Sequence, residues 1–212
     1  MKAKAVLAAV ATAAFLTLAG GASAQAPAAP RAANPPAPTI NIRGTITAFD
    51  GKTLQVKDAA GKIVSIEVPD TLNVTVAKTF SLADIKPGTV LGLTTLQRPD
   101  GTVVALDIHP NPANTPLSTR EYDLAPGSQM NNGKVEAVVA TATANGTELT
   151  LNYGTGTVKA LVTPQTTMSQ AVPGGRSDVK VGEAVYVRAR TDVTPMVATQ
   201  VEVGKDGVKP TQ

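Results

Sequence analysis

A turn that leads into a strand occurs twice in this sequence and constrains the fold more than any other feature. The first copy lies at residues 84–93 and the second at residues 178–187, 94 positions later. Each copy reads as a short polar turn, a glycine and then a run of apolar residues. The recurrence predicts that the chain holds two copies of one small β-domain.

Apolar and polar residues alternate in short runs within each predicted domain, which is the period of a half-buried strand. Pro69 and Pro164 end the third run of each domain, because proline cannot donate to a strand ladder. Ser81 followed by Asp84 predicts a capped helical turn in the first crossover. The predicted strands lie at residues 40–48, 54–56, 64–68, 90–96, 104–108, 135–139, 149–153, 158–162, 185–189 and 197–203.

A meander of three strands, a crossover and a hairpin form the layout of an OB-like barrel. The sequence therefore predicts an all-β protein with two tandem small OB-like five-stranded barrels, at residues 40–109 and 131–204. A Pro-rich connector at residues 110–130 separates the two barrels, and residues 205–212 are expected to form a flexible tail.

The connector contains four prolines that should break any regular element. Tyr122 and Leu124 lie among them, and two interpretations stay open. Either these side chains pack against a barrel, which is the usual role of an aromatic residue with one aliphatic neighbour, or they belong to a surface recognition segment. The prolines are Pro110, Pro112, Pro116 and Pro126.

The first 24 residues read as a cleaved secretory signal peptide of the bacterial Sec type. Lys2 and Lys4 supply the positive start, an apolar run follows, and residues 22–24 form a small-x-small cleavage site. This apolar run is short for a bilayer span, and no second run of spanning length follows it. Residues 25–39 are mainly Ala and Pro, which predicts a disordered linker. We therefore expect a periplasmic or secreted protein.

The chain contains no cysteine, which excludes disulfides, thiolate metal sites, a cysteine nucleophile and a lipoprotein anchor. Its formal charge of +3 includes Lys2 and Lys4 of the leader, which holds no acidic residue. The remaining chain carries +1, from 17 basic and 16 acidic residues. With only three Phe and three Tyr and no Trp, this composition argues against a nucleic-acid partner.

His109 is the only histidine, and Asp107 lies two residues before it on a predicted strand. Residues at this spacing point to the same side of a strand, so the pair supplies two candidate ligands for a metal site. However, the alternation places Asp107 toward solvent, and no further histidine or cysteine completes a zinc or copper site. An exposed His109 without a metal is the favoured interpretation, and weak metal-ion binding at Asp107 and His109 is the alternative.

No catalytic constellation is visible in the sequence. A serine hydrolase would have to use His109, and no Gly-x-Ser-x-Gly motif exists. The glycines at 154 and 156 lack the third glycine and the strand-to-helix context of a dinucleotide-binding loop. We therefore expect neither an enzyme activity nor a bound cofactor.

Tyr186, Arg188 and Arg190 alternate along one predicted strand and should share the face opposite Val185 and Val187. An aromatic ring beside two guanidinium groups suits an anionic ligand. The favoured interpretation is a solvated outer strand face whose arginines protect a sheet edge. The alternative is a ligand-binding surface at Tyr186, Arg188 and Arg190.

Gly44, the turn at residues 50–51, the turn at residues 84–90 and the strand at residues 104–108 together form a recognisable pattern. The pattern resembles a group of exported bacterial proteins with tandem OB-like domains and no established activity. It covers the first domain well and the second loosely, since the proline of the first turn is replaced by valine in the second. The resemblance implies a periplasmic location and supplies no catalytic residues.

These inferences define one expected function. The leader, the linker and the doubled domain favour a non-enzymatic periplasmic module that binds a ligand or a cell-envelope partner through exposed β-surface. A small anionic ligand or an envelope protein is the expected partner. Weak metal-ion binding or transport at Asp107 and His109 is the alternative function.

Overall fold

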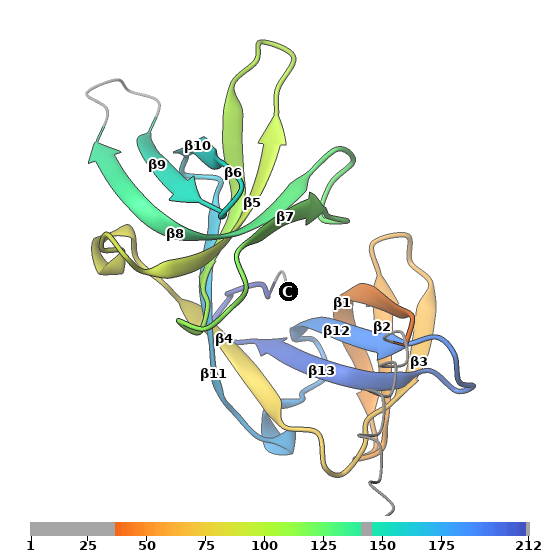
Figure 1. Ribbon diagram of the computed structural model, residues 1–212. Helices are drawn as coiled ribbons and strands as arrows, with labels where there is room; N and C mark the ends of the chain where they lie inside the picture. Colours follow the sequence, from red (N-terminus) through yellow and green to blue (C-terminus); the bar gives the residue numbers. More distant parts are fainter. Residues whose placement is uncertain (1–36, 141–145, 211–212) are drawn as a thin grey trace, which may run out of the picture. The chain divides into compact units, whose positions relative to one another are not determined.

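The computed structural model describes residues 37–140 and 146–210, which are all-β, as predicted. The predicted signal peptide and residues 25–36 of the predicted linker lie outside the described residues. The described chain also holds two 3-10 turns, η1 (Leu82–Asp84) and η2 (Arg176–Asp178). The strands are β1 (Thr39–Phe49), β2 (Thr53–Asp58), β3 (Ile63–Glu67), β4 (Val74–Thr79), β5 (Val90–Gln97), β6 (Val103–Pro110), β7 (Ser118–Glu121), β8 (Gln129–Ala140), β9 (Thr147–Asn152), β10 (Thr157–Val162), β11 (Thr167–Pro173), β12 (Ala184–Arg190) and β13 (Val197–Gly204) (Figure 1).

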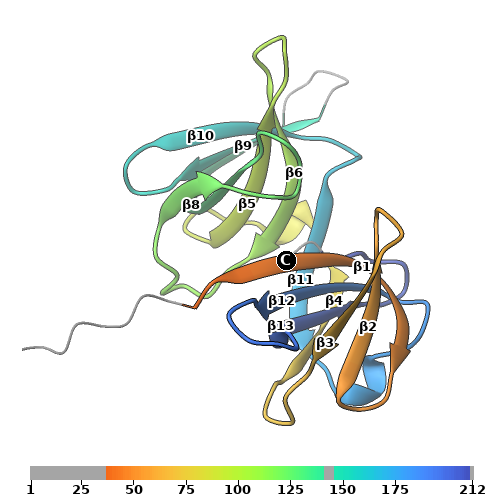
Figure 2. The same ribbon diagram turned by 90° about the vertical axis from the view of Figure 1, so that its right-hand side faces the viewer.

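Two closed circuits of strand pairing organise the sheet (Figures 1 and 2). The first circuit runs β1, β2, β3, β13, β12 and back to β1, and its closing contact is a parallel one between Glu67 and Val197. The second circuit runs β8, β9, β10, β6, β5 and back to β8, and its closing contact is a parallel one between Leu161 and Val104. β7 pairs with β8 outside the second circuit.

Each circuit encloses its own apolar core, built from the inward faces of its alternating strands. The first core contains Ile42, Ile46, Leu54, Val56, Ile66, Val68, Val74, Val179, Val185, Val187, Ala189, Ala198, Val201 and Val203. The second core contains Phe80, Ile85, Leu91, Leu93, Ala105, Ile108, Val135, Leu149, Leu151, Ala160 and Val162.

The predicted domain boundaries do not coincide with these two cores. Residues 40–109 were expected to form one domain, but β5 and β6 close the second circuit rather than the first. In the same way, β12 and β13 of the range 131–204 close the first circuit. Each meander is therefore completed by the hairpin from the other predicted domain, and all described residues belong to one compact unit.

The strands β4 and β11 connect the two circuits and pair with each other (Figure 1). Their antiparallel register extends from Thr75↔Pro173 to Thr79↔Ser169. β4 also pairs in parallel with β13 of the first circuit, and β11 pairs in parallel with β6 of the second. Neither strand was predicted, because apolar and polar residues do not alternate cleanly in either stretch of sequence.

The two repeated turns make matching contacts on the exchanged partners. Gly88 and Gly182 adopt positive φ angles of 88° and 92°, which favour glycine. The Gly88 amide donates to the carbonyl of Val135 on β8 (2.9 Å), and the Gly182 amide donates to the carbonyl of Ile46 on β1 (2.9 Å). Each turn therefore docks on the meander that lies in the other half of the sequence.

The helical turn predicted before the first repeated turn is present. Ser81 caps η1, since its hydroxyl accepts from the Ala83 amide (3.2 Å) and its amide donates to Asp84 Oδ2 (3.2 Å). At η2 the cap is a glycine, and the Gly175 amide donates to Asp178 Oδ2 (2.9 Å). The acidic residue that opens each repeated turn thus has a local structural role.

Two other sequence predictions need correction. The connector was expected to hold no regular element, yet β7 and the start of β8 lie within it, because its prolines fall outside both strands. Tyr122 is buried, as the packing interpretation required. In the predicted flexible tail, the Val208 amide donates to the Lys205 carbonyl (3.0 Å) and Pro210 is buried, so this part is packed.

Candidate functional site

The residues predicted as a ligand surface do not share an exposed strand face. Tyr186 was expected on an outer face, but its side chain is fully buried, because a second layer that includes Tyr122 covers this face of β12. Arg188 Nε donates to Asn41 Oδ1 (3.3 Å). Arg190 forms an ion pair with Asp192 at 2.7 Å. The solvated-face interpretation is therefore wrong for Tyr186, and all three side chains have partners within the chain.

Arginine and tyrosine side chains alternate in a stack beside this face. The Arg43 guanidinium carbon lies 5.2 Å from the ring centroid of Tyr122 and 5.2 Å from that of Tyr186. Arg120 lies on the Tyr122 ring as well, also at 5.2 Å. A guanidinium over a tyrosine ring is worth about 0.5–2 kcal/mol, more when desolvated. The stack, defined as Arg120, Tyr122, Arg43 and Tyr186, joins the segment after β7 to β1 and β12.

Hydrogen bonds fix the members of the stack. Arg43 Nη2 donates to Tyr122 Oη (2.9 Å) and to Asp123 Oδ1 (3.1 Å). Asn41 Nδ2 donates to the same Asp123 oxygen (3.0 Å), and Tyr186 Oη donates to Asn41 Oδ1 (2.7 Å). Because both sides of the network are hydrogen-bonded, its side chains have little freedom to move.

The protonation states follow from burial and from these contacts. Burial opposes the charge of Arg43, but the hydrogen bond to Asp123 and the electrostatic attraction of Asp123, Tyr122 and Tyr186 together outweigh it and raise the pKa of Arg43. Burial opposes the charge of Asp123 as well, yet the hydrogen bonds from Arg43 and Asn41 lower the pKa of Asp123. Burial raises the pKa of both Tyr122 and Tyr186. At neutral pH the cluster is therefore an ion pair with two neutral phenols.

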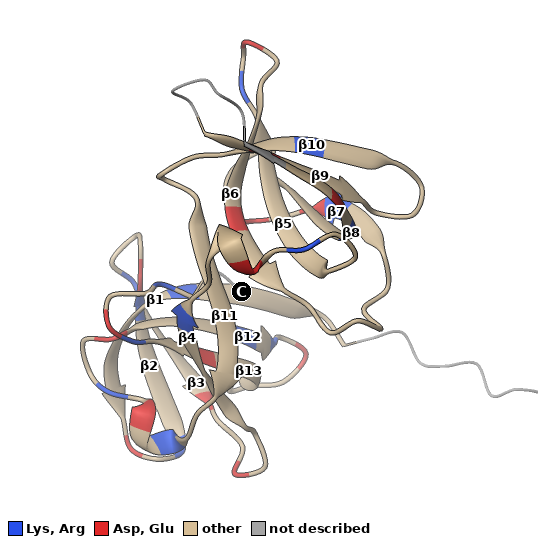
Figure 3. Ribbon diagram, turned by 90° about the vertical axis from the view of Figure 1, so that its left-hand side faces the viewer, with Lys and Arg blue, Asp and Glu red and all other residues tan. Residues whose placement is uncertain are grey.

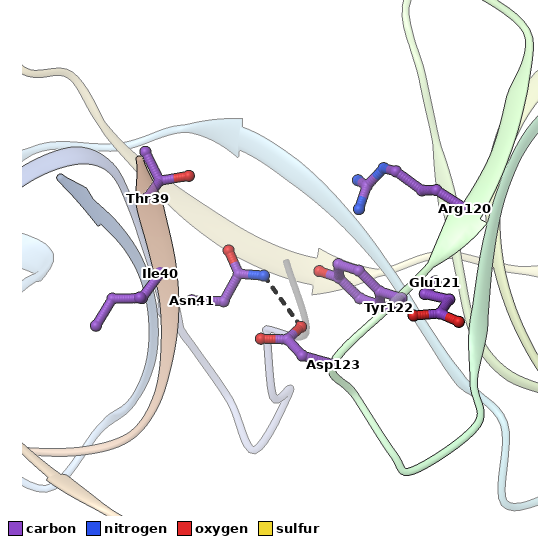
Figure 4. Close-up of a pocket in the computed structure, with 7 residues that line it drawn as sticks. All are labelled: Thr39, Ile40, Asn41, Arg120, Glu121, Tyr122 and Asp123. Atoms are coloured by element: carbon purple, nitrogen blue, oxygen red, sulfur yellow. Dashed lines mark hydrogen bonds between the residues drawn. The ribbon is translucent and has the colours of Figure 1, made fainter. Parts of the chain in front are cut away.

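A pocket of about 590 Å³ opens beside the stack (Figure 4). One wall is the start of β1, and the other is the end of β7 with the two residues that follow it. Within the described residues, the Arg120 side chain forms no ion pair, and its guanidinium lies on the Tyr122 ring. The pocket is lined by Thr39, Ile40, Asn41, Arg120, Glu121, Tyr122 and Asp123.

The connector contribution to this pocket was only partly visible in the sequence. Tyr122 stood out as an aromatic residue among prolines, but nothing linked it to Arg43, which lies 79 positions earlier.

Figure 3 shows Lys and Arg interspersed with Asp and Glu on both groups of strands, without a single-sign stretch in that view. The site depends on local pairing and stacking rather than on a strong overall field.

The predicted metal residues are buried rather than exposed. His109 Nδ1 lies 2.8 Å from Asp107 Oδ2, and the two side chains expose 3% and 1% of their surface. Asp107 was expected to face solvent, but its side chain is fully buried at the point where β11 pairs with β6. His109 Nε2 has no hydrogen-bond partner among the described residues. No group of three His, Cys, Asp or Glu residues suited to a metal occurs in the described chain.

A third buried titratable residue, Glu202, was missed by the sequence analysis. It lies on β13 between the core residues Val201 and Val203, so alternation alone placed it toward solvent. Its side chain is only 3% exposed. Burial and the nearby charge of Asp107 raise the pKa of Glu202 to about 7.

Comparison of the chain with known protein families, curated proteins and solved structures gave no match. None of the helices in the described residues is long and apolar enough to cross a membrane.

Proposed function

We propose that this protein is a non-enzymatic periplasmic binding module that holds a small anionic ligand in the pocket at Arg120 and Tyr122. The single observation that carries the proposal is the state of Arg120. Its guanidinium lies on an aromatic ring at the wall of a pocket and has no carboxylate partner among the described residues. A planar guanidinium in this position suits a carboxylate or phosphate group, which it can bind through two parallel hydrogen bonds.

The surroundings of Arg120 support a preorganised site. The Tyr122 ring contacts the guanidinium groups of Arg120 and Arg43, and its hydroxyl accepts a hydrogen bond from Arg43. The orientation of the ring is therefore fixed before any ligand binds. Preorganisation reduces the entropy that binding must overcome. Asn41 and Thr39 from β1 supply polar groups on the opposite wall. The pocket volume of about 590 Å³ falls in the range of small-molecule sites.

The charges around the pocket favour a ligand with few negative charges. The Asp123 carboxylate is offset by Arg43, with which it forms an ion pair at 3.1 Å. Glu121 lines the same pocket and is exposed. It would repel a polyanion, which agrees with the small charge of the mature chain and argues against nucleic acid. An acidic group on an envelope protein is the second partner that fits this chemistry.

The strand pairing also supports a more specific description of the fold. Each closed circuit consists of a three-stranded meander and a hairpin, which favours two OB-like five-stranded barrels from a duplicated domain. In this proposal the hairpins were exchanged after duplication. The leader read from the sequence supports export to the periplasm. OB-like folds serve many functions, so the ligand proposal depends on the site and not on the fold.

The proposal is tested by NMR titration of the purified protein with acetate, benzoate and inorganic phosphate. We expect saturable shifts of the Arg120 and Tyr122 signals with at least one of these probes, and loss of these shifts in Arg120→Gln. Arg98→Gln is the matched control, because Arg98 is exposed on the β5–β6 turn and does not line the pocket. Absence of binding by all three probes, or equal binding by Arg120→Gln, contradicts the proposal.

A further inference from the structure

The pocket at Arg120 opens on an unpaired edge of β1. On one side, residues 39–45 of β1 pair with β12. On the other side, the register with β2 begins only at Gly44, so residues 39–42 have no strand partner there within the described chain. The pocket is lined by the consecutive residues Thr39, Ile40 and Asn41 and by no described residue of β12 (Figure 4). Consecutive side chains point to opposite faces of a strand, so a pocket that meets all three lies at the strand edge.

Thr39 and Asn41 direct their backbone N–H and C=O groups toward this open edge. In an antiparallel ladder, residues that bond to the partner strand alternate with residues whose backbone groups point away from it. The Thr191 amide donates to the Pro38 carbonyl (3.0 Å), and the register of β1 with β12 continues from there. The even-numbered residues of β1 therefore bond to β12, and the backbone groups of Thr39 and Asn41 face the groove.

The open edge has none of the features that usually prevent a further strand from pairing. Natural edge strands are protected by charged residues, by proline or by a bulge. Residues 39–42 read Thr-Ile-Asn-Ile, and the Ile40 side chain is 42% exposed. Asn41 is held in place, since its side chain donates to Asp123 (3.0 Å) and accepts from Tyr186 (2.7 Å). The edge is therefore fixed in position and presents an apolar side chain to a partner.

A second pocket extends the groove along the same edge. It has a volume of about 390 Å³ and is lined by residues 40–43 of β1, residues 58–60, Lys62 and Val64. Ile40 and Asn41 line both pockets. The two pockets together follow β1 from Thr39 toward the β2–β3 turn, which is the path that an added strand would take.

The position of Arg120 selects one end of such a strand. β2 runs antiparallel to β1 and turns away after Asp58, which pairs with Gly44. A peptide that continues the line of β2 along β1 runs in the same direction, so its C-terminal end lies opposite Thr39. Thr39 and Arg120 line the same pocket. The terminal carboxylate can therefore accept hydrogen bonds from the Thr39 N–H and from the Arg120 guanidinium.

We infer that the occupant of this groove is the C-terminal segment of a partner protein, which adds to β1 as an antiparallel strand. The inference rests on the proposed function, since it names the source of the anionic group at Arg120. Backbone hydrogen bonds to Thr39 and Asn41 supply affinity, and alternate side chains supply specificity. The last residue of the partner lies opposite Thr39 and the penultimate one opposite Ile40. An apolar penultimate residue would therefore cover the exposed Ile40 side chain.

NMR titration of the purified protein with the acetylated pentapeptide Thr-Val-Thr-Val-Ala tests the inference. We expect saturable shifts of the Thr39 and Asn41 amide signals. The same peptide with a C-terminal amide should bind about tenfold more weakly, because it loses a charge-assisted hydrogen bond. N-methylation of the peptide residue opposite Asn41 should weaken binding about fivefold or more, since that N–H faces β1. N-methylation of the penultimate residue is the matched control, because its N–H points away from β1.

Two protein variants separate this inference from the proposed function. Ile40→Thr should weaken peptide binding about fourfold and leave acetate binding unchanged, because acetate does not reach that side chain. Ile63→Thr, at an exposed position of β3 that lines neither pocket, should change neither. Peptide binding no tighter than acetate binding, or equal binding of the acid and amide peptides, overturns the inference and leaves the proposed function intact. Failure of the peptide and of acetate, benzoate and phosphate alike overturns both.

A second copy of this chain and its own residues 25–36 are the competing occupants of the groove. Shifts of the Thr39 and Asn41 signals on dilution of the protein alone would assign the edge to a second copy. Peptide binding that occurs only after deletion of residues 25–36 would assign it to that segment. Either result overturns the inference.

Discussion

The imidazole of His109 lies directly against the backbone of Gly92, its cross-strand partner on β5. A Cβ atom placed on Gly92 would lie 1.7 Å from His109 Nε2. This close approach explains both why residue 92 is a glycine and why Nε2 has no partner in the described chain. The glycine provides the space in which a buried histidine can pair with Asp107.

This relationship predicts that Gly92→Ala destabilises the protein by about 1–3 kcal/mol, the usual cost of overpacking. His109→Ala in the same chain should recover much of the loss, because it removes the clash. Chemical denaturation of the two single variants and the double variant measures the coupling. Gly175→Ala is the control, since a Cβ there meets nothing closer than 3.7 Å. Additive effects of the two substitutions would contradict the proposed contact.

Replacement of Arg43 should destabilise the packing of residues 120–123 on β1. Arg43→Ala removes stacking on two tyrosine rings and hydrogen bonds to Tyr122 and Asp123, so we expect a loss of about 2–4 kcal/mol. Arg43→Lys should recover only part, because a lysine lacks the planar fork. Arg98→Ala on the exposed turn should change the free energy of unfolding by less than about 0.5 kcal/mol. Equal stability of Arg43→Ala and the natural protein would refute the role of the stack.

The raised pKa of Glu202 predicts that the free energy of unfolding falls as the pH rises from acid to neutral. The pKa of Glu202 is about 7 in the folded protein, whereas its ordinary value is 4.5. Between these two pH values the folded state therefore holds a proton that the unfolded state has lost. The stabilising effect is complete below about pH 4.5 and is lost by about pH 7, a change of about 3 kcal/mol. Urea denaturation at several pH values measures it, and Glu202→Gln should flatten this part of the profile. A profile that rises from pH 4.5 to pH 7 and is the same in both proteins would count against it.

The exchanged hairpins predict that neither half of the chain folds alone. A fragment of residues 37–116 holds the meander of the first circuit and the hairpin of the second, so each part lacks its partner. The fragment of residues 117–210 has the reverse deficiency. We expect each fragment to lack dispersed NMR signals and cooperative unfolding, and an equimolar mixture to recover both. Independent folding of either fragment would instead support two tandem domains.

The strands themselves were largely predictable from the sequence. Alternation at residues 64–68 correctly placed Ile66 and Val68 in a core, and the turn glycines Gly88 and Gly182 marked where the next strands begin. The cap of η1 was predicted from Ser81 and Asp84 because capping is decided within four residues. Such features depend on neighbours along the chain, so composition and spacing are sufficient to find them.

The candidate site could not be predicted in the same way. Tyr186 and Asp107 both follow the outward period of their strands, and only contacts with segments distant in the sequence bury them. The partners of Arg43 lie 79 and 80 positions away, and no local pattern links them. Glu202 gave no signal at all, because a glutamate between two valines is typical of an exposed strand face.

By itself, the amino-acid sequence determined that the chain would form short strands joined by glycine turns in two similar series. It did not determine which hairpin completes which meander. Valine, isoleucine and leucine faces are chemically alike, so either hairpin can fill either core, and the choice depends on where β4 and β11 carry the chain. Only the tertiary structure decided that each meander is completed by the hairpin from the other half of the sequence, and in that arrangement Asp107, His109 and Glu202 are buried away from water.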